Sequence, residues 1–257
     1  RGDKADPLSR GHVCPKAVAL RDIHEDPDRL RKPLKRVRSV AGVYEHVEIE
    51  WDEALDLVAS ALSDTIERHG VDAIGAYFGN PSVHNYGMLT HQRNLFRHIR
   101  TRNRFSATSV DQLPHHLVSM WLYGHMLLSP IPDIDRTHYF LMLGANPLAS
   151  NGSIWTVPDV RKRIKDLTAR GGKLVVIDPR KTETAELASE HHFIRPGTDA
   201  AFLLGLIHVL FRDNLADLGK LSGVVDGIAE VREAVSALNP EWAAAATGIE
   251  AHDITRI

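Results

Sequence analysis

The chain has 257 residues, enough for one large or two modest domains. Apolar residues make up 43% and charged residues 25%, the ordinary mix of a globular protein, which excludes disorder as the main state. The net charge of −2 provides no basic field for nucleic acid. No apolar run approaches the ~20 residues that span a bilayer. We therefore expect no nucleic-acid partner and no direct membrane insertion.

The two ends of the sequence indicate a piece of a longer chain. It begins with Arg1 rather than Met, and residues 253–257 are typical of the start of a helix. The location we expect is cytoplasmic. A single cysteine, Cys14, excludes an intrachain disulfide framework but leaves metal chemistry open.

The residue pattern predicts an irregular N-terminal arm followed by alternating helices and strands. Residues 1–50 hold four prolines and many charges, whereas from Trp51 onward apolar residues recur at helical spacing or in short continuous runs. The predicted helices are 51–69, 83–99, 112–123, 154–169, 200–211 and a segment from about 226 with a break at Asn239 and Pro240. The predicted strands are 72–78, 139–143, 173–177 and 191–194.

This alternation predicts an α/β fold: a mostly parallel sheet with helices on both faces, preceded by the irregular arm. We divide the chain into residues 1–50 and an α/β domain, 51–257, that is incomplete at its C-terminus. Ligands of such sheets bind beyond the carboxyl ends of the strands. The loops of interest are therefore 79–81, 144–147, 178–180 and 195–199.

The chemistry of these loops suits a nucleotide-bearing ligand. Gly144 permits close backbone approach, Asn146 offers a donor and an acceptor, Asp178 can hold a sugar hydroxyl and Arg180 can pair with a phosphate. Taken singly, each loop is equally a tight turn with a helix cap. Neither a G-x-G-x-x-G motif after a strand nor a P-loop is present, the 15 histidines form no zinc pattern, and no G-x-S-x-G elbow occurs.

Five motifs in register carry a resemblance to a known family. They are R-G-D-K-A-D-P-L-S-R-G-H-V-C-P-K-A at the start, then W-D-E-A-L, G-A-N-P, V-I-D-P-R-K-T-E-T-A and R-P-G-T-D. From Arg1 to about Asn214 the sequence resembles the molybdopterin oxidoreductase superfamily of formate dehydrogenase, nitrate reductase and dimethyl-sulfoxide reductase. It is similar to the N-terminal fragment of their catalytic subunit.

The resemblance implies two cofactors. One is molybdenum or tungsten held by bis-molybdopterin guanine dinucleotide, and the other is a 4Fe-4S cluster on the arm of the full-length protein. Cys14 matches the last cluster cysteine, the other three being expected upstream. Lys16 matches the lysine between cluster and pterin, and Ala17 replaces the usual glycine. The residues that match cofactor-binding loop positions are Gly144, Asn146, Asp178, Arg180, Gly197 and Asp199. Residues 1–50 would then be the last part of the iron–sulfur arm, and residues 51–257 would be the domain that binds the molybdopterin dinucleotide.

Asp111 matches the position of the metal's protein ligand. In the family this ligand lies before a helix, with a proline three residues on and a glycine after the helix, as Pro114 and Gly124 are here. A carboxylate is a hard donor suited to a high-valent metal. The alternative is that Asp111 caps the N-terminus of the helix at 112–123.

The resemblance implies a two-electron oxidation or reduction of a small-molecule substrate, with single electrons exchanged through the cluster with a redox partner protein or subunit. The fragment alone should be inactive. Two alternatives stay open. One is a non-catalytic electron-transfer or scaffold subunit of a respiratory complex with the same fold. The other is a plain α/β nucleotide binder, which leaves the Cys14–Lys16 segment unexplained.

Overall fold

The computed structural model describes residues 1–152, 155 and 157–257. It divides into two compact units. Unit 1 consists of residues Arg1–Pro15 and Ile131–Ile257, and unit 2 of Lys16–Pro130. These units follow from contacts within the chain, and the predicted domain boundary near residue 50 stays a prediction. None of the helices in the described part of the chain is long and apolar enough to cross a membrane.

Unit 1 is built on a parallel three-stranded sheet with β6 in the middle. Its strands are β5 (Tyr139–Leu143), β6 (Lys173–Ile177) and β7 (Glu190–His192), in the order β5-β6-β7. The register pairs Tyr139 with Lys173 and Leu143 with Ile177, so β5 and β6 end level with each other. The predictions for 139–143 and 173–177 are confirmed, because continuous apolar runs of this length suit strands that are covered on both faces.

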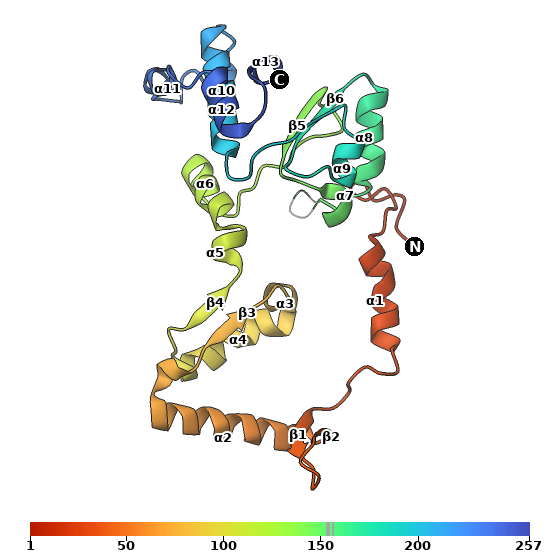
Figure 1. Cartoon of the computed structure of the whole chain (residues 1–257). Helices are drawn as coiled ribbons and strands as arrows, with labels where there is room; N and C mark the ends of the chain where they lie inside the picture. Colours follow the sequence, from red (N-terminus) through yellow and green to blue (C-terminus); the bar gives the residue numbers. More distant parts are fainter. Residues whose placement is uncertain (153–154, 156) are drawn as a thin grey trace. The chain divides into compact units, whose positions relative to one another are not determined.

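Helices cover both faces of this sheet, as predicted. Alternate residues of β6 face opposite ways: Leu174 and Val176 belong to one buried cluster, whereas Val175 and Ile177 belong to another. The first cluster includes Ile164 and Leu167 of α8, and the second includes residues of α10, α12 and α13. Figure 1 shows α8 on one side of the strands and α10 with α12 on the other.

The helices of unit 1 follow the predicted pattern with shifted ends. The predicted start at Ile154 lies outside the described residues, and α8 begins after Asp159, whose side chain accepts a hydrogen bond from the Lys162 amide. The predicted break at Asn239 and Pro240 is confirmed, because Asn239 caps the next helix through the Trp242 amide at 2.9 Å. The helices are α7 (Pro147–Ser150), α8 (Val160–Ala169), α9 (Glu183–Glu186), α10 (Asp199–Arg212), α11 (Ile228–Ala234), α12 (Pro240–Thr247) and α13 (Ala251–Arg256), with a 3-10 turn, η3 (Gly219–Leu221).

Unit 2 contains a second parallel pair of strands and five helices that follow the arm. The predicted helix at 83–99 is divided in two, because Asn85 caps the second part through the Met88 amide at 2.9 Å. Only the end of the predicted strand at 72–78 is a strand; its start forms a 3-10 turn. The elements are α2 (Trp51–His69), η1 (Val71–Ala73), β3 (Ala76–Phe78), α3 (Pro81–His84), α4 (Tyr86–Ile99), β4 (Arg104–Ser106), α5 (Thr108–Asp111) and α6 (Leu113–Tyr123).

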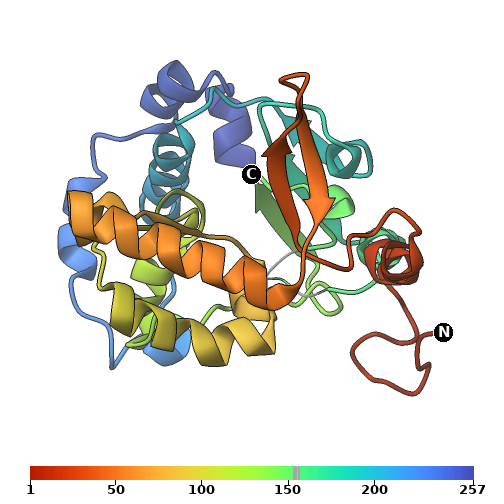
Figure 2. The same cartoon turned by 90° about the horizontal axis from the view of Figure 1, so that it is seen from below.

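The N-terminal arm is more regular than the sequence predicted. It contains a helix, α1 (Pro15–Glu25), and an antiparallel hairpin of β1 (Leu34–Arg38) and β2 (Tyr44–Glu48), seen as the orange-red arrows in Figure 2. Across the hairpin, the Arg36 guanidinium lies 4.7 Å from the centre of the Tyr44 ring. Local side-chain pairs thus order a segment whose prolines indicated an irregular chain.

Candidate cofactor and metal site

The three loops predicted to bind a cofactor leave the same edge of the unit 1 sheet. Gly144 and Asn146 follow β5, Asp178 and Arg180 follow β6, and the loop at 195–199 follows β7. The loops are joined by backbone hydrogen bonds, from the amide of Gly144 to the carbonyl of Ile177 at 2.9 Å and from the amide of Asp178 to the carbonyl of His192 at 3.1 Å. The parallel topology therefore places the starts of the three loops, with Gly144 and Asp178, at one edge.

Two glycines leave open space at this edge. Gly144 has φ of +61° and Gly197 has φ of +81°, values that side chains other than glycine rarely adopt. A Cβ atom built on either residue would meet no heavy atom within 4 Å. The glycines therefore serve the backbone conformation, and the space beside them is free for a bound group to approach the main chain.

Asn146 is held by a network that the sequence pattern did not reveal. Its Oδ1 accepts a hydrogen bond from the hydroxyl of Thr184 at 2.7 Å, and its Nδ2 donates to Glu183 at 2.8 Å. The amide of Leu148 also donates to the Thr184 hydroxyl, at 3.3 Å. The Glu183 backbone amide and then Asn146 lower the pKa of Glu183. The network fixes the 144–147 loop against α9.

Asp178 and Arg180 differ in how much of each side chain is available to bind a ligand. Asp178 is buried at the end of β6, and one of its oxygens accepts a hydrogen bond from the Arg180 amide at 2.8 Å, which is a turn contact. The Arg180 side chain is exposed. Arg195, in the third loop, instead donates to the carbonyls of Ala245 and Ala246 at the end of α12, at 3.1 and 2.5 Å. It therefore caps a helix. Asp199 is the first residue of α10.

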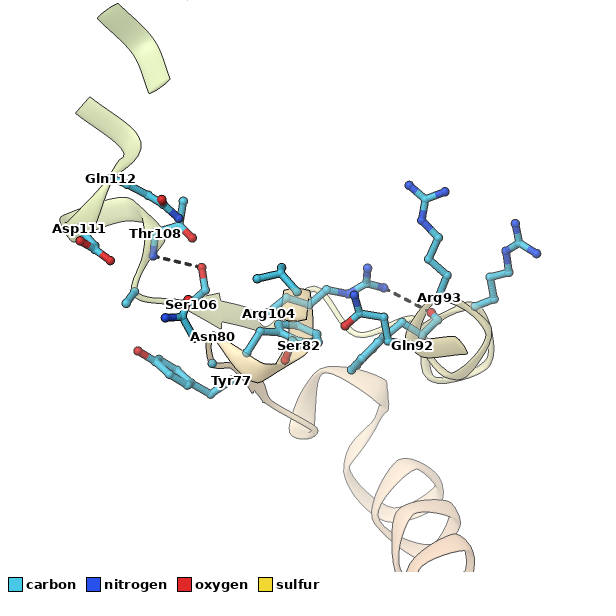
Figure 3. Close-up of a pocket in the computed structure, with 16 residues that line it drawn as sticks. Tyr77, Asn80, Ser82, Gln92, Arg93, Arg104, Ser106, Thr108, Asp111 and Gln112 are labelled. Atoms are coloured by element: carbon cyan, nitrogen blue, oxygen red, sulfur yellow. Dashed lines mark hydrogen bonds between the residues drawn. The ribbon is translucent and has the colours of Figure 1, made fainter. Parts of the chain in front are cut away.

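A pocket of about 800 Å³ lies at the carboxyl ends of the other parallel pair, in unit 2. Phe78 of β3 pairs with Ser106 of β4, so the two strands end together. The chain after β3 contributes Gly79 and Asn80, and the chain after β4 contributes Asp111. Figure 3 shows Asp111, Asn80 and Ser106 on one side of the pocket, with Gln92 and Arg93 of α4 on the other.

Asp111 does not cap the helix that follows it. It is the last residue of α5, and α6 begins at Leu113 with Gln112 at the cap position and no side-chain cap hydrogen bond. The Asp111 side chain is exposed, and within the described residues its carboxylate accepts no hydrogen bond. The capping alternative is therefore wrong, and the role of Asp111 as a metal ligand stays a prediction.

The sequence analysis missed several polar residues of this pocket. Arg93, Arg97 and Arg104 line it, and among the described residues none of them forms an ion pair. The Oε1 atom of Gln92 is buried without a hydrogen-bond partner in the described part of the chain, and Ser82 is 92% buried there. A bound group with donors and negative charge would satisfy this lining. The one sequence signal is the i, i+4 spacing of Arg93 and Arg97 on a helix.

Cys14 and Lys16 lie on the arm, on either side of the point in the sequence where unit 1 gives way to unit 2. Cys14, in unit 1, is half-buried, and its Sγ accepts a hydrogen bond from Asn151 Nδ2 at 3.5 Å. Lys16 is exposed in the first turn of α1. The chain has one cysteine, so it offers one of the four thiolates of a 4Fe-4S cluster. No group of three or more His, Cys, Asp or Glu that could hold a metal ion occurs in residues 1–152, 155 and 157–257.

The parallel strands and the helices that cover them define the class of the chain as α/β. In this class, ligands bind in the loops beyond the carboxyl ends of the strands. Comparison with known families is more specific. The family model described as molybdopterin oxidoreductase matches residues 29–240. The chain therefore belongs to the molybdopterin oxidoreductase family, and membership implies a molybdopterin cofactor with molybdenum or tungsten.

Individual relatives agree with this assignment. The chain is 32% identical over 254 residues to formate dehydrogenase H of Escherichia coli, covering 96% of this chain and 34% of the relative. It is 30% identical over 267 residues to the probable oxidoreductase YoaE of Bacillus subtilis, covering 100% and 36%. The solved structure of acetylene hydratase from Pelobacter acetylenicus matches with a TM-score of 0.73 at 29% identity, covering 97% and 33%. The chain thus spans about a third of the length of these relatives.

Proposed function

We propose that the complete protein is an oxidoreductase that carries molybdenum or tungsten on bis-molybdopterin guanine dinucleotide. It oxidises or reduces a small substrate by two electrons and exchanges these singly, through a 4Fe-4S cluster, with a redox partner protein or subunit. The observation that carries the proposal is Asp111, which lines a pocket at paired strand ends, does not cap the following helix and accepts no hydrogen bond from any residue that the structure describes.

The residues of the chain suit the parts of this function. When bound, the metal cofactor supplies the two-electron redox chemistry. A metal held mainly by its organic cofactor needs one protein donor, and Asp111 provides a hard oxygen. The three arginines of the pocket favour bound negative charge. In unit 1, the main chain at Gly144 and Gly197 is open to the approach of a dinucleotide, to which Asn146, Asp178, Arg180 and Asp199 would offer polar groups.

The arm would connect the site to the electron partner. Cys14 would provide one thiolate to the cluster, and the other three would come from cysteines upstream of Arg1 in the full-length protein. Lys16, exposed two residues further on, would place a positive charge between cluster and pterin, where it favours the passage of electrons.

Two alternative functions, a non-catalytic electron-transfer subunit and a hydratase, can be distinguished from the proposed one by experiment. A non-catalytic electron-transfer subunit of the same fold would contain iron but neither molybdenum nor tungsten. The similar solved structure is named a hydratase, and hydration transfers no electrons between substrate and protein. Metal analysis of the full-length protein, together with a dye-linked redox assay, distinguishes all three functions.

The substitution that tests the metal site is Asp111→Asn in the full-length protein. Asparagine keeps the size of the side chain but removes the anionic oxygen, so we expect normal folding and pterin content, altered X-ray absorption of the metal and at least about a hundredfold less turnover. The matched control is Asp64→Asn, an exposed carboxylate of α2 that pairs with Arg68 outside the pocket and should change nothing. Unchanged metal–ligand distances and turnover in Asp111→Asn would refute the ligand role.

A further inference from the structure

A buried arginine joins the start of the N-terminal arm, residues 1–14, to the rest of unit 1. Arg163 of α8 is 92% buried, and each nitrogen of its guanidinium has a separate partner. Nε donates to the carbonyl of Pro158 at 2.8 Å, Nη2 donates to the carbonyl of Leu8 at 3.1 Å, and Nη1 pairs with Asp135. One side chain therefore links the segments around Leu8 and Asp135, distant in sequence, to the start of α8. Figure 1 shows the red N-terminal segment beside α7 and α8.

Asp135 completes the link from the opposite side. The oxygen that pairs with Arg163 also accepts a hydrogen bond from Nη2 of Arg10, on the arm, at 3.0 Å. Burial alone would raise the pKa of Asp135, but the hydrogen bonds and charges of Arg163 and Arg10 outweigh burial, and the pKa is lowered. Without this carboxylate, the buried Arg163 guanidinium would lose its counter-charge, and Arg10 would lose its partner.

The arm between these contacts and Cys14 is short. Arg10 is followed by Gly11, whose φ of +83° turns the chain, and Cys14 comes three residues later. There the Asn151 side chain donates to the Cys14 sulfur from the loop after α7. The arm is thus held at Leu8 and Arg10 on one side and at Cys14 on the other.

We propose that Asp135 is a positioning residue: through Arg10 and Arg163 it holds residues 1–14 against the rest of unit 1 and so fixes the place of the Cys14 thiol. The consequence for electron transfer rests on the proposed function, in which Cys14 is a cluster ligand. The positioning itself does not, because every contact that carries it lies within unit 1 of this chain.

The test compares substitutions in the full-length protein. Hydrogen–deuterium exchange would follow the arm amides of Arg10 and His12, which are hydrogen-bonded to Asp6 and Ser9, against those of β6 as an internal reference. Alkylation of Cys14 in protein prepared without the cluster would follow the thiol. For Asp135→Asn we expect about tenfold faster arm exchange and alkylation, with β6 unchanged.

Three further variants sharpen the result. Arg10→Met, at an exposed position that should not affect folding, should reproduce the faster exchange of Asp135→Asn, whereas Asp135→Glu should restore wild-type behaviour because the charge is kept. The control is Asp133→Asn, which removes an exposed ion pair with Arg136 two residues away and should leave the arm unchanged.

Unchanged exchange in Asp135→Asn and Arg10→Met would overturn the proposal. Equal acceleration of the arm and β6 would also overturn it, since that marks a general loss of stability. Both measurements can be made on protein that contains neither molybdenum nor a cluster. Absence of these cofactors would therefore refute the proposed function and leave the positioning result intact.

Discussion

The hydroxyl of Thr184 provides a quantitative test of the network that orders the 144–147 loop. Thr184 is fully buried, donates to Asn146 Oδ1 at 2.7 Å and accepts from the Leu148 amide at 3.3 Å. Valine has nearly the same shape but no hydroxyl, so Thr184→Val removes both hydrogen bonds while keeping the volume. Serine keeps the hydroxyl and removes one methyl group.

The two substitutions have different expected costs. In Thr184→Val, the half-buried Leu148 amide loses its partner at about 1–3 kcal/mol, and the more accessible Asn146 oxygen adds about 0.5–1 kcal/mol, so we expect about 1.5–4 kcal/mol in total. In Thr184→Ser, the lost methyl costs about 1 kcal/mol. We therefore expect Thr184→Val to be more destabilising than Thr184→Ser. Loss of side-chain volume alone would give the opposite order, because serine is the smaller residue.

Urea unfolding of the two variants and wild type, followed by circular dichroism, measures these differences directly. Binding of the pterin cofactor by the full-length protein provides a second measurement, in which Thr184→Val should be weakened more than Thr184→Ser. If Thr184→Ser is as destabilised as Thr184→Val or more, packing rather than hydrogen bonding holds this loop, and our account of Asn146 is wrong.

Two other predictions concern the helices behind the sheet. Gly205→Ala should destabilise unit 1 by about 1–3 kcal/mol, because the new Cβ would lie 2.8 Å from the Cβ of Ala243; wild-type stability in urea would contradict this. The pKa values of Glu190 and Asp253 are lowered from 4.5 and 3.8, first by hydrogen bonds from Arg256, so the stability they contribute is complete above these values and is lost as pH falls through the lowered ones. Urea unfolding at pH 3 and 6 should show this loss in wild type and less of it in Arg256→Met, and equal losses in both would count against the pairing.

The sequence predicted the sheet of unit 1 well because its signals are local. β5 and β6 are continuous apolar runs, and the break before α12 is marked by Asn239 and Pro240. Parallel topology then required the loops after the strands to meet at one edge, which is why Asn146 and Asp178 could be placed together. The arm was harder, because the pairing of Arg36 with Tyr44 across the hairpin stabilises it without a periodic pattern.

The parts of the site that escaped prediction depend on contacts between distant segments. Whether Arg195 meets an anion or the end of α12 depends on where residues 245 and 246 lie, 50 positions further along the chain. The face of α4 that lines the pocket, with Gln92 and Arg93, is set by how that helix packs beside β3 and β4. The capping alternative for Asp111 failed for a local reason, since α5 continues through Asp111 and α6 starts two residues later.

The discontinuity of unit 1 has a consequence for the order of events during synthesis. The arm leaves the ribosome first, yet its anchors are Asp135 and Arg163, which lie 125 and 155 residues beyond Arg10 and Leu8. Unit 2 is synthesised in between, and contacts of such long sequence separation form late in folding. The contacts that hold Cys14 in place therefore form only after α8 has been made, and in the proposed function a cluster inserted earlier would be held by a segment with no fixed surroundings.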